Sequence, residues 1–117
     1  MQGNLAALRS SQQLENKQVK AIASFPTHSA NRYLAQLCDH FGRKIKAEHG
    51  DAKGSIEFSF GRCQLTASDS DLEILAQADD QTRLDQVIGI LTSHLERFAF
   101  RENPFLDWQK IETNQPT

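Results

Sequence analysis

The sequence lacks several features that would assign it to a familiar functional class. It has no excess of basic residues, because 13 lysines and arginines stand against 15 aspartates and glutamates, for a formal net charge of −2. Nucleic-acid binding depends on neutralising phosphates, so this balance argues against it. No apolar run reaches the roughly 18 residues that a membrane span needs, and the N-terminus has no apolar segment followed by a small-residue cleavage site. We therefore expect a cytoplasmic protein that binds neither nucleic acid nor membranes.

Cysteine and the common catalytic motifs are also scarce. The two cysteines, Cys38 and Cys63, belong to no CxxC pair, so we expect two buried thiols rather than a disulfide framework. The sequence has no GxSxG, GxGxxG or GxxxxGK motif, which leaves hydrolase, dinucleotide-binding and phosphate-loop chemistry without support. We therefore predict no cofactor, and an enzyme is less favoured than a binding protein.

The composition fits one domain. A chain of 117 residues, 38% of them hydrophobic, can bury a single core. We predict a flexible N-terminal arm over residues 1–17, one domain over residues 18–110 and a loose C-terminal tail over residues 111–117.

Hydrophobic periodicity predicts two amphipathic helices. Apolar residues recur at three- and four-residue steps between Ala30 and Phe41, after Thr27 or Ser29 as the cap and before Gly42 as the end. A longer stripe of this kind follows Asp79 or Asp80 and stops at Asn103-Pro104; it consists of Leu84, Val87, Ile88, Leu91, Leu95 and Phe98. Gly89 interrupts this second helix at a cost of about 1 kcal/mol relative to alanine.

The rest of the domain alternates with a period of two, which is typical of strands. The stretch before Pro26 and four short runs between the helices place apolar residues on one face. The segment FLDWQKIE after Pro104 is predicted to form a short strand or an extended clamp. The predicted fold is α+β: a two-layer sandwich in the order β-α-β-β-β-β-α with an extended C-terminal segment. Its antiparallel sheet has four to six short strands, with two amphipathic helices on one face. The other face carries Ile22 and Leu75, and is either hydrated or a surface for a protein partner or homodimer.

Two histidines lie at the edges of the apolar helix faces. If the helices pack side by side, His40 and His94 could approach each other and bind a soft metal or haem, or titrate near neutral pH. The alternative is that each is a border histidine with a backbone or water partner. No third ligand is evident from the spacing, so we predict no metal site and retain the pair only as weak metal candidates.

Arginines at the end of the second helix form the other candidate site. Arg97 and Arg101 are four residues apart and share a helix face. They complement the negative end of the helix dipole, and with Arg32 from the first helix they could form a small anion clamp. The predicted ligand-binding residues are therefore Arg32, His40, His94, Arg97 and Arg101.

Three blocks of the sequence resemble a bacterial family, domain-of-unknown-function family 2218. The blocks are NRYLAQLCDHFGRK, GSIEFSFGRCQL and SHLERFAFRENPFLDWQ, and the resemblance covers roughly residues 18–110. The family pattern falls on Arg32, Tyr33, Leu37, Cys38, His40, Phe41, Gly61, His94, Leu95, Glu96, Arg97, Phe98 and Trp108. Some relatives have a histidine or second basic residue at the position of Arg43, and the arginine here weakens a ligand role at that position.

The resemblance implies an accessory role rather than a defined reaction. The family has no established activity, and its association with siderophore-interacting ferric reductases implies a part in iron or siderophore handling. We therefore expect a non-enzymatic domain that binds a small anionic ligand, a ferric siderophore or a protein partner. The alternative is a homodimerisation module without a small-molecule ligand.

Overall fold

The computed structural model describes residues 18–111. The elements follow in the order β1 (Val19–Pro26), α2 (Ala30–Phe41), β2 (Lys46–Gly50), β3 (Lys53–Phe58), β4 (Gly61–Ala67), β5 (Asp71–Ala78), α3 (Gln81–Phe98), the 3-10 helix η1 (Phe100–Glu102) and β6 (Gln109–Ile111). The predicted arm, residues 1–17, and residues 112–117 of the predicted tail lie outside this range.

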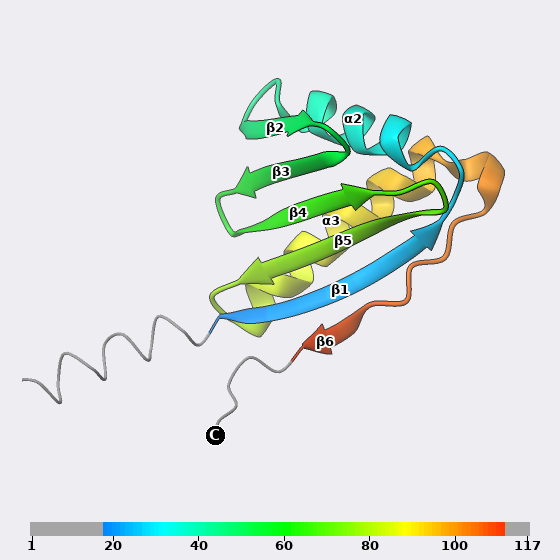
Figure 1. Cartoon of the computed structure of the whole chain (residues 1–117). Coiled ribbons are helices and arrows are strands. Elements are labelled where there is room, and N and C mark those ends of the chain that lie inside the picture. Colours follow the sequence, from blue (N-terminus) through cyan, green and yellow to red (C-terminus); the bar gives the residue numbers. More distant parts are fainter. Residues whose placement is uncertain (1–17, 112–117) are drawn as a thin grey trace, which may run out of the picture.

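The strands form one antiparallel sheet in the order β2-β3-β4-β5-β1-β6. Both helices cover the same face of this sheet (Figure 1), with α2 packed mainly over β2 and β3 and α3 over β4, β5 and β1. The predicted α+β sandwich is thereby confirmed, with six strands and with β6 as the strand of the C-terminal segment.

The core lies between the helices and the covered face of the sheet. In the pair β1–β5, Ala21 lies opposite Ala76 and Ala23 opposite Ile74, so that small and large buried residues share one face. The buried part of the α3 stripe comprises Leu84, Val87, Leu91 and Leu95. Burying a leucine side chain completely contributes about 1.5–3 kcal/mol before entropy costs, so this stripe holds α3 against the sheet.

The two helices begin differently. The Asp80 side chain accepts a hydrogen bond from the Arg83 backbone N–H at 2.8 Å and caps α3 as predicted. The Ser29 side chain forms no such cap on α2, and the Thr27 hydroxyl instead accepts from the Ser29 backbone N–H at 3.0 Å. Thr27 therefore shapes the entry to α2 from outside the helix.

The segment after α3 returns along the sheet edge. Trp108 Nε1 donates to the Thr92 hydroxyl at 2.9 Å, and β6 then pairs with β1, with Ile111 opposite Lys20. Figure 1 shows this segment running beside β1 to the edge of the sheet. Neither helix of the described part has the length and apolar composition that a membrane-spanning segment needs.

Candidate functional site

His40 and His94 meet where α2 and α3 pack together. The two imidazole centroids are 4.9 Å apart, and both rings contact Phe41, at 5.0 Å and 4.8 Å respectively. At the other end of α2, the Tyr33 hydroxyl donates to Glu102 beyond α3 at 2.5 Å. The end of α2 therefore lies beside His94 in α3, and the beginning of α2 lies beside η1, which follows α3, so the helices run antiparallel.

The five predicted residues do not gather at one place. Arg32 lies over the Tyr33 ring, with the guanidinium carbon 5.0 Å from its centroid, and Arg101 lies 5.6 Å from the centroid of Phe100. The positive charge of Arg32 acts on Tyr33 and Glu102. The charge of Arg97 acts on His40 instead. The structure thus brings His40 and His94 together, keeps Arg97 within electrostatic range of His40, and places Arg32 and Arg101 elsewhere.

A pocket opens beside the two imidazoles. It has a volume of about 410 Å³. We call it the histidine pocket, and its lining consists of His40, Phe41, Arg43, Lys44, Ile45, Phe58, Phe60, Ile90 and His94. No carboxylate is part of this lining, so the pocket combines an apolar interior with cationic side chains.

The aromatic part of the pocket is continuous. Phe41 meets Phe58 edge-on, with centroids 5.2 Å apart and ring planes at 81°, and Phe58 stacks on Phe60 at 5.2 Å and 18°. Phe58 and Phe60 point to the covered face of the sheet, as the period of two predicts. They lie at the β3–β4 turn, where the helices no longer cover them completely, so they are only partly buried.

The cationic side of the pocket comes from the end of α2 and the turn that follows. The carbonyls of this helix end are bonded within the backbone: Phe41 O accepts from the N–H groups of Lys44 and Ile45, both at 3.0 Å. Within residues 18–111, neither Arg43 nor Lys44 forms an ion pair. Their charges are therefore available to interact with the helix dipole and with a ligand in the pocket.

The field in the pocket is positive. The pKa of His40 is lowered from its ordinary value, first by desolvation and then by the basic groups His94, Arg43, Arg97 and Lys44. Every charged group named in this shift is basic. A neutral imidazole is therefore favoured at His40 while the pocket holds no anion.

His94 has a fixed orientation. Its Nδ1 lies 2.7 Å from the Ile90 carbonyl oxygen, to which it must donate, so Nε2 is the ring nitrogen left for another hydrogen-bond partner. Ser93 donates to the same carbonyl at 3.2 Å and is thus not activated by His94. Among the described residues there is no group of three or more potential metal ligands, so the two imidazoles would lack the third protein ligand that a zinc site requires.

The two cysteines offer no nucleophile. Both are buried thiols. Burial is the main cause that raises the pKa of Cys38 to about 11 and that of Cys63 to about 12. The thiolate is the reactive form, so at neutral pH both side chains act as small core residues.

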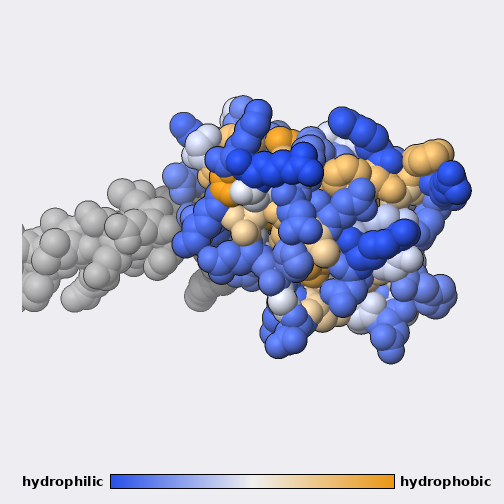
Figure 2. All heavy atoms as spheres, turned by 90° about the horizontal axis from the view of Figure 1, so that it is seen from above, coloured by the Kyte–Doolittle hydropathy of each residue, from blue (hydrophilic) through white to orange (hydrophobic). Residues whose placement is uncertain are grey.

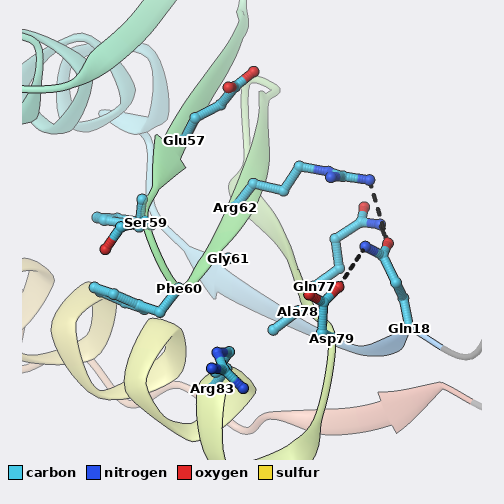
Figure 3. A pocket seen from close by; sticks show the side chains of 11 residues that line it. Gln18, Glu57, Ser59, Phe60, Gly61, Arg62, Gln77, Ala78, Asp79 and Arg83 are labelled. Atoms are coloured by element: carbon cyan, nitrogen blue, oxygen red, sulfur yellow. Dashed lines mark hydrogen bonds between the residues drawn. The ribbon is translucent and has the colours of Figure 1, made fainter. Parts of the chain in front are cut away.

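A second cavity, of about 250 Å³, lies between the β3–β4 turn and the start of α3. Figure 3 shows Gln18 joined to Arg62, Gln77 and Asp79 in this cavity. Gln18 accepts from Arg62 at 3.3 Å and from Gln77 at 2.8 Å, and it donates to Asp79 at 3.2 Å. These bonds tie the start of β1 to β4 and to the end of β5. Since these bonds already engage Gln18, Arg62, Gln77 and Asp79, this cavity is a weaker candidate than the histidine pocket.

Other apolar surface in the described part is scattered. Figure 2 shows one face as mainly hydrophilic, with separate apolar patches. The most exposed large hydrophobic side chains of the described part, Phe100 at 66% and Phe105 at 78%, follow α3 and line no part of the histidine pocket. Their exposure therefore does not compete with the pocket as a small-molecule site.

Sequence reasoning assigned no site role to seven of the nine pocket residues. They are Phe41, Arg43, Lys44, Ile45, Phe58, Phe60 and Ile90. Two signals were available: the consecutive cations Arg43 and Lys44 directly after a helix that ends in His40-Phe41, and the pair Phe58 and Phe60 beside a turn. What the sequence could not give is that the turn and the helix end face each other.

Comparison with known proteins identifies the family but no activity. The family model described as "Uncharacterized protein conserved in bacteria (DUF2218)" matches residues 22–109. No curated protein matches the chain. A solved structure, the NMR structure of PA4090 from Pseudomonas aeruginosa, is similar with a TM-score of 0.68 and 29% identity, over 77% of this chain and 94% of that one. The chain thus belongs to the bacterial family of uncharacterized proteins DUF2218.

Proposed function

We propose that this chain is a non-enzymatic domain that binds a small organic anion in the histidine pocket. The observation that carries the proposal is the lining itself: an apolar interior of about 410 Å³ with Arg43, Lys44 and two imidazoles, and without a carboxylate. Small-molecule sites are mostly apolar cavities of about 300–1,000 Å³ with a few polar groups that orient the ligand. The histidine pocket matches that description at its smaller end.

The charges explain why the ligand should be an anion. The basic groups around His40 lower its pKa, so they repel further positive charge. An anion at the same place would relieve this repulsion and would provide Arg43 and Lys44 with a partner. An interaction with a charged hydrogen-bonding group contributes about 1.5–3 kcal/mol when it is well aligned, which is enough to select an acid over its neutral analogue.

A binding role fits the described residues better than catalysis. An enzyme of the acyl-transfer or hydrolytic kind needs a nucleophile within reach of a base. In the described part, the thiols are buried and the Ser93 hydroxyl is bonded to a backbone carbonyl. His94 is held by the same carbonyl, so no nucleophile–base pair is assembled at the pocket.

A role in iron handling is a narrower form of this proposal. It rests on the family resemblance alone. Siderophore complexes that carry negative charge belong to the proposed ligand class, but a pocket of about 410 Å³ favours a compact ligand or one arm of a chelate. Titration with an anionic ferric chelate and with its iron-free form tests this narrower proposal. If neither form binds, a role in iron handling is excluded, while binding of other organic anions remains possible.

The test of the main proposal is a thermal-shift panel of organic acids, each paired with its neutral amide. We expect acids to raise the melting temperature and amides to leave it unchanged. The double variant Arg43→Ala/Lys44→Ala should lose the response. Arg32→Ala and Arg101→Ala are matched controls, since each removes an exposed arginine outside the pocket. The proposal fails if acids and amides give equal shifts, or if the controls lose the response and the double variant keeps it.

A homodimer is the second candidate function, supported by the outer face of the sheet. Ile22 lies opposite Leu75 in the β1–β5 pair, both are half-buried, and Ile111 on β6 is 37% exposed. These side chains form a small apolar strip on the face that no described helix covers (Figure 1). Light scattering across a concentration series tests it, and the variant Leu75→Lys should keep the protein monomeric. A monomer at every concentration would exclude the dimer.

A further inference from the structure

The walls of the histidine pocket are made mostly of rings. Five of its nine lining residues carry one, namely His40, Phe41, Phe58, Phe60 and His94. The remaining apolar residues are Ile45 and Ile90. Ring walls offer flat, rigid surfaces, and such surfaces attract a flat partner through offset stacking and edge-to-face contact.

The geometry of these rings is already set by their packing with one another. Phe58 stacks on Phe60 with ring planes 18° apart, whereas Phe41 is edge-on to Phe58 at 81°. The His94 ring lies 4.8 Å from Phe41, with planes at 52°. The pocket thus presents both ring faces and ring edges, which are the two surfaces that an aromatic ligand can use.

All the basic side chains of the lining except His94 come from one stretch of the chain. His40, Arg43 and Lys44 lie within five consecutive positions at the end of α2, whereas Phe58 and Phe60 come from β3 and its turn, and Ile90 from α3. A ligand that uses both parts needs one anionic group attached directly to a rigid apolar body. A flexible chain could also fill the pocket, but it would lose internal rotational freedom on binding.

We infer that the histidine pocket takes a planar aromatic carboxylate of one or two fused rings, with its ring among Phe41, Phe58 and Phe60 and its carboxylate at Arg43 and Lys44. This inference rests on the proposed function and specifies its ligand class. An arginine side chain suits both parts of such a ligand, because its guanidinium pairs with carboxylates and stacks on aromatic faces.

The test compares three probes by calorimetric titration at constant salt: 2-naphthoate, decanoate and 2-naphthamide. The first two share the carboxylate and differ in the body, while the first and third share the ring system and differ in charge. We expect 2-naphthoate to bind at least about 10-fold more tightly than either of the others, since it alone uses both the rings and the cations.

Variants separate the ring contribution from the general apolar one. Phe58→Leu keeps an apolar side chain and removes a ring, so it should weaken 2-naphthoate by about 2- to 12-fold and leave decanoate unchanged. Phe60→Leu serves as the second variant if Phe58→Leu does not fold. Phe100→Leu is the matched control, because it removes an exposed ring outside the pocket, and it should change neither affinity.

Each outcome has a distinct meaning. Decanoate binding as tightly as 2-naphthoate would overturn the aromatic class while leaving the proposed anion binding intact. Equal binding of 2-naphthoate and 2-naphthamide would overturn the proposed function itself, as would the absence of binding by both acids. Loss of 2-naphthoate affinity in Phe100→Leu but not in the pocket variants would move the ligand to a different site.

Discussion

Two glycines should respond to the same substitution with opposite signs. A Cβ atom at Gly61 would lie 2.7 Å from the Gln77 carbonyl oxygen and 2.7 Å from Val87 Cγ2, closer than real Cβ contacts allow. A Cβ atom at Gly89 would have no neighbour within 4 Å. Gly61→Ala therefore tests a close approach between the β3–β4 turn and α3. Gly89→Ala is its matched control, because Gly89 lies within α3 itself.

The size of each effect follows from these distances. An ordinary contact begins at about 3.4 Å, so both neighbours of the new methyl group at Gly61 would have to yield by about 0.7 Å. The Gln77 carbonyl belongs to the inner strand β5 and Val87 is fully buried, so neither moves freely. Overpacking of this kind costs about 1–3 kcal/mol. At Gly89, alanine should instead stabilise the helix by about 0.5–1 kcal/mol.

The assay is thermal or urea unfolding followed by circular dichroism. At roughly 4 °C per kcal/mol for a domain of this size, Gly61→Ala should lower the melting temperature by about 4–12 °C and Gly89→Ala should raise it by about 2–4 °C. A Gly61→Ala variant as stable as the wild type would refute the close approach. A destabilised Gly89→Ala variant would show that α3 contacts something at that position.

Three further predictions concern local structure. Tyr33→Phe removes the hydroxyl that donates to Glu102 at 2.5 Å and should lower the free energy of unfolding by about 1–2 kcal/mol at neutral pH. Because this bond holds the pKa of Glu102 below its ordinary value, the loss of stability should vanish as the pH falls through that lowered pKa. An equal loss of stability in acid would contradict this prediction. Burial raises the pKa of Cys38 to about 11 and of Cys63 to about 12. At mildly alkaline pH, iodoacetamide should therefore modify the native protein at least about 100-fold more slowly than the unfolded chain. Rapid labelling of the native protein would disprove this. Ala52 has a left-handed φ of 66° in the β2–β3 turn, a conformation that glycine adopts without steric strain. Ala52→Gly should therefore raise the free energy of unfolding, measured in urea, by about 0.5–1 kcal/mol. Any loss of stability would contradict the turn geometry.

The fold was largely predictable because its signals are local. The stripe from Leu84 to Phe98 specifies a helix by its period alone. The alternation around Ile56 and Leu65 specifies strands, and both of these inward residues are fully buried. The order of the strands was not predictable in this way. β1 lies between β5 and β6, and this arrangement depends on pairings between residues far apart in the sequence, for which a period of two contains no information.

The candidate site was predictable only in part, for the same reason. The positions of His40 and His94 at the edges of two apolar faces indicated that they could meet, and their rings are in contact. Helical spacing grouped Arg97 with Arg101, but Arg101 belongs to η1, after α3 has ended at Phe98. Periodicity describes one element at a time, so it could not indicate that Phe58 and Phe60 from a strand turn complete a pocket formed by two helices.

The most direct test of anion binding is the pKa of His40, measured by histidine-ring NMR with and without saturating 2-naphthoate. In the free protein, desolvation and the surrounding basic groups hold this pKa below its ordinary value. A carboxylate bound beside Arg43 and Lys44 stabilises the protonated imidazole, so the account predicts that the pKa of His40 rises on binding and that binding takes up protons near neutral pH. A His40 pKa that stays the same in the presence of 2-naphthoate would contradict the account.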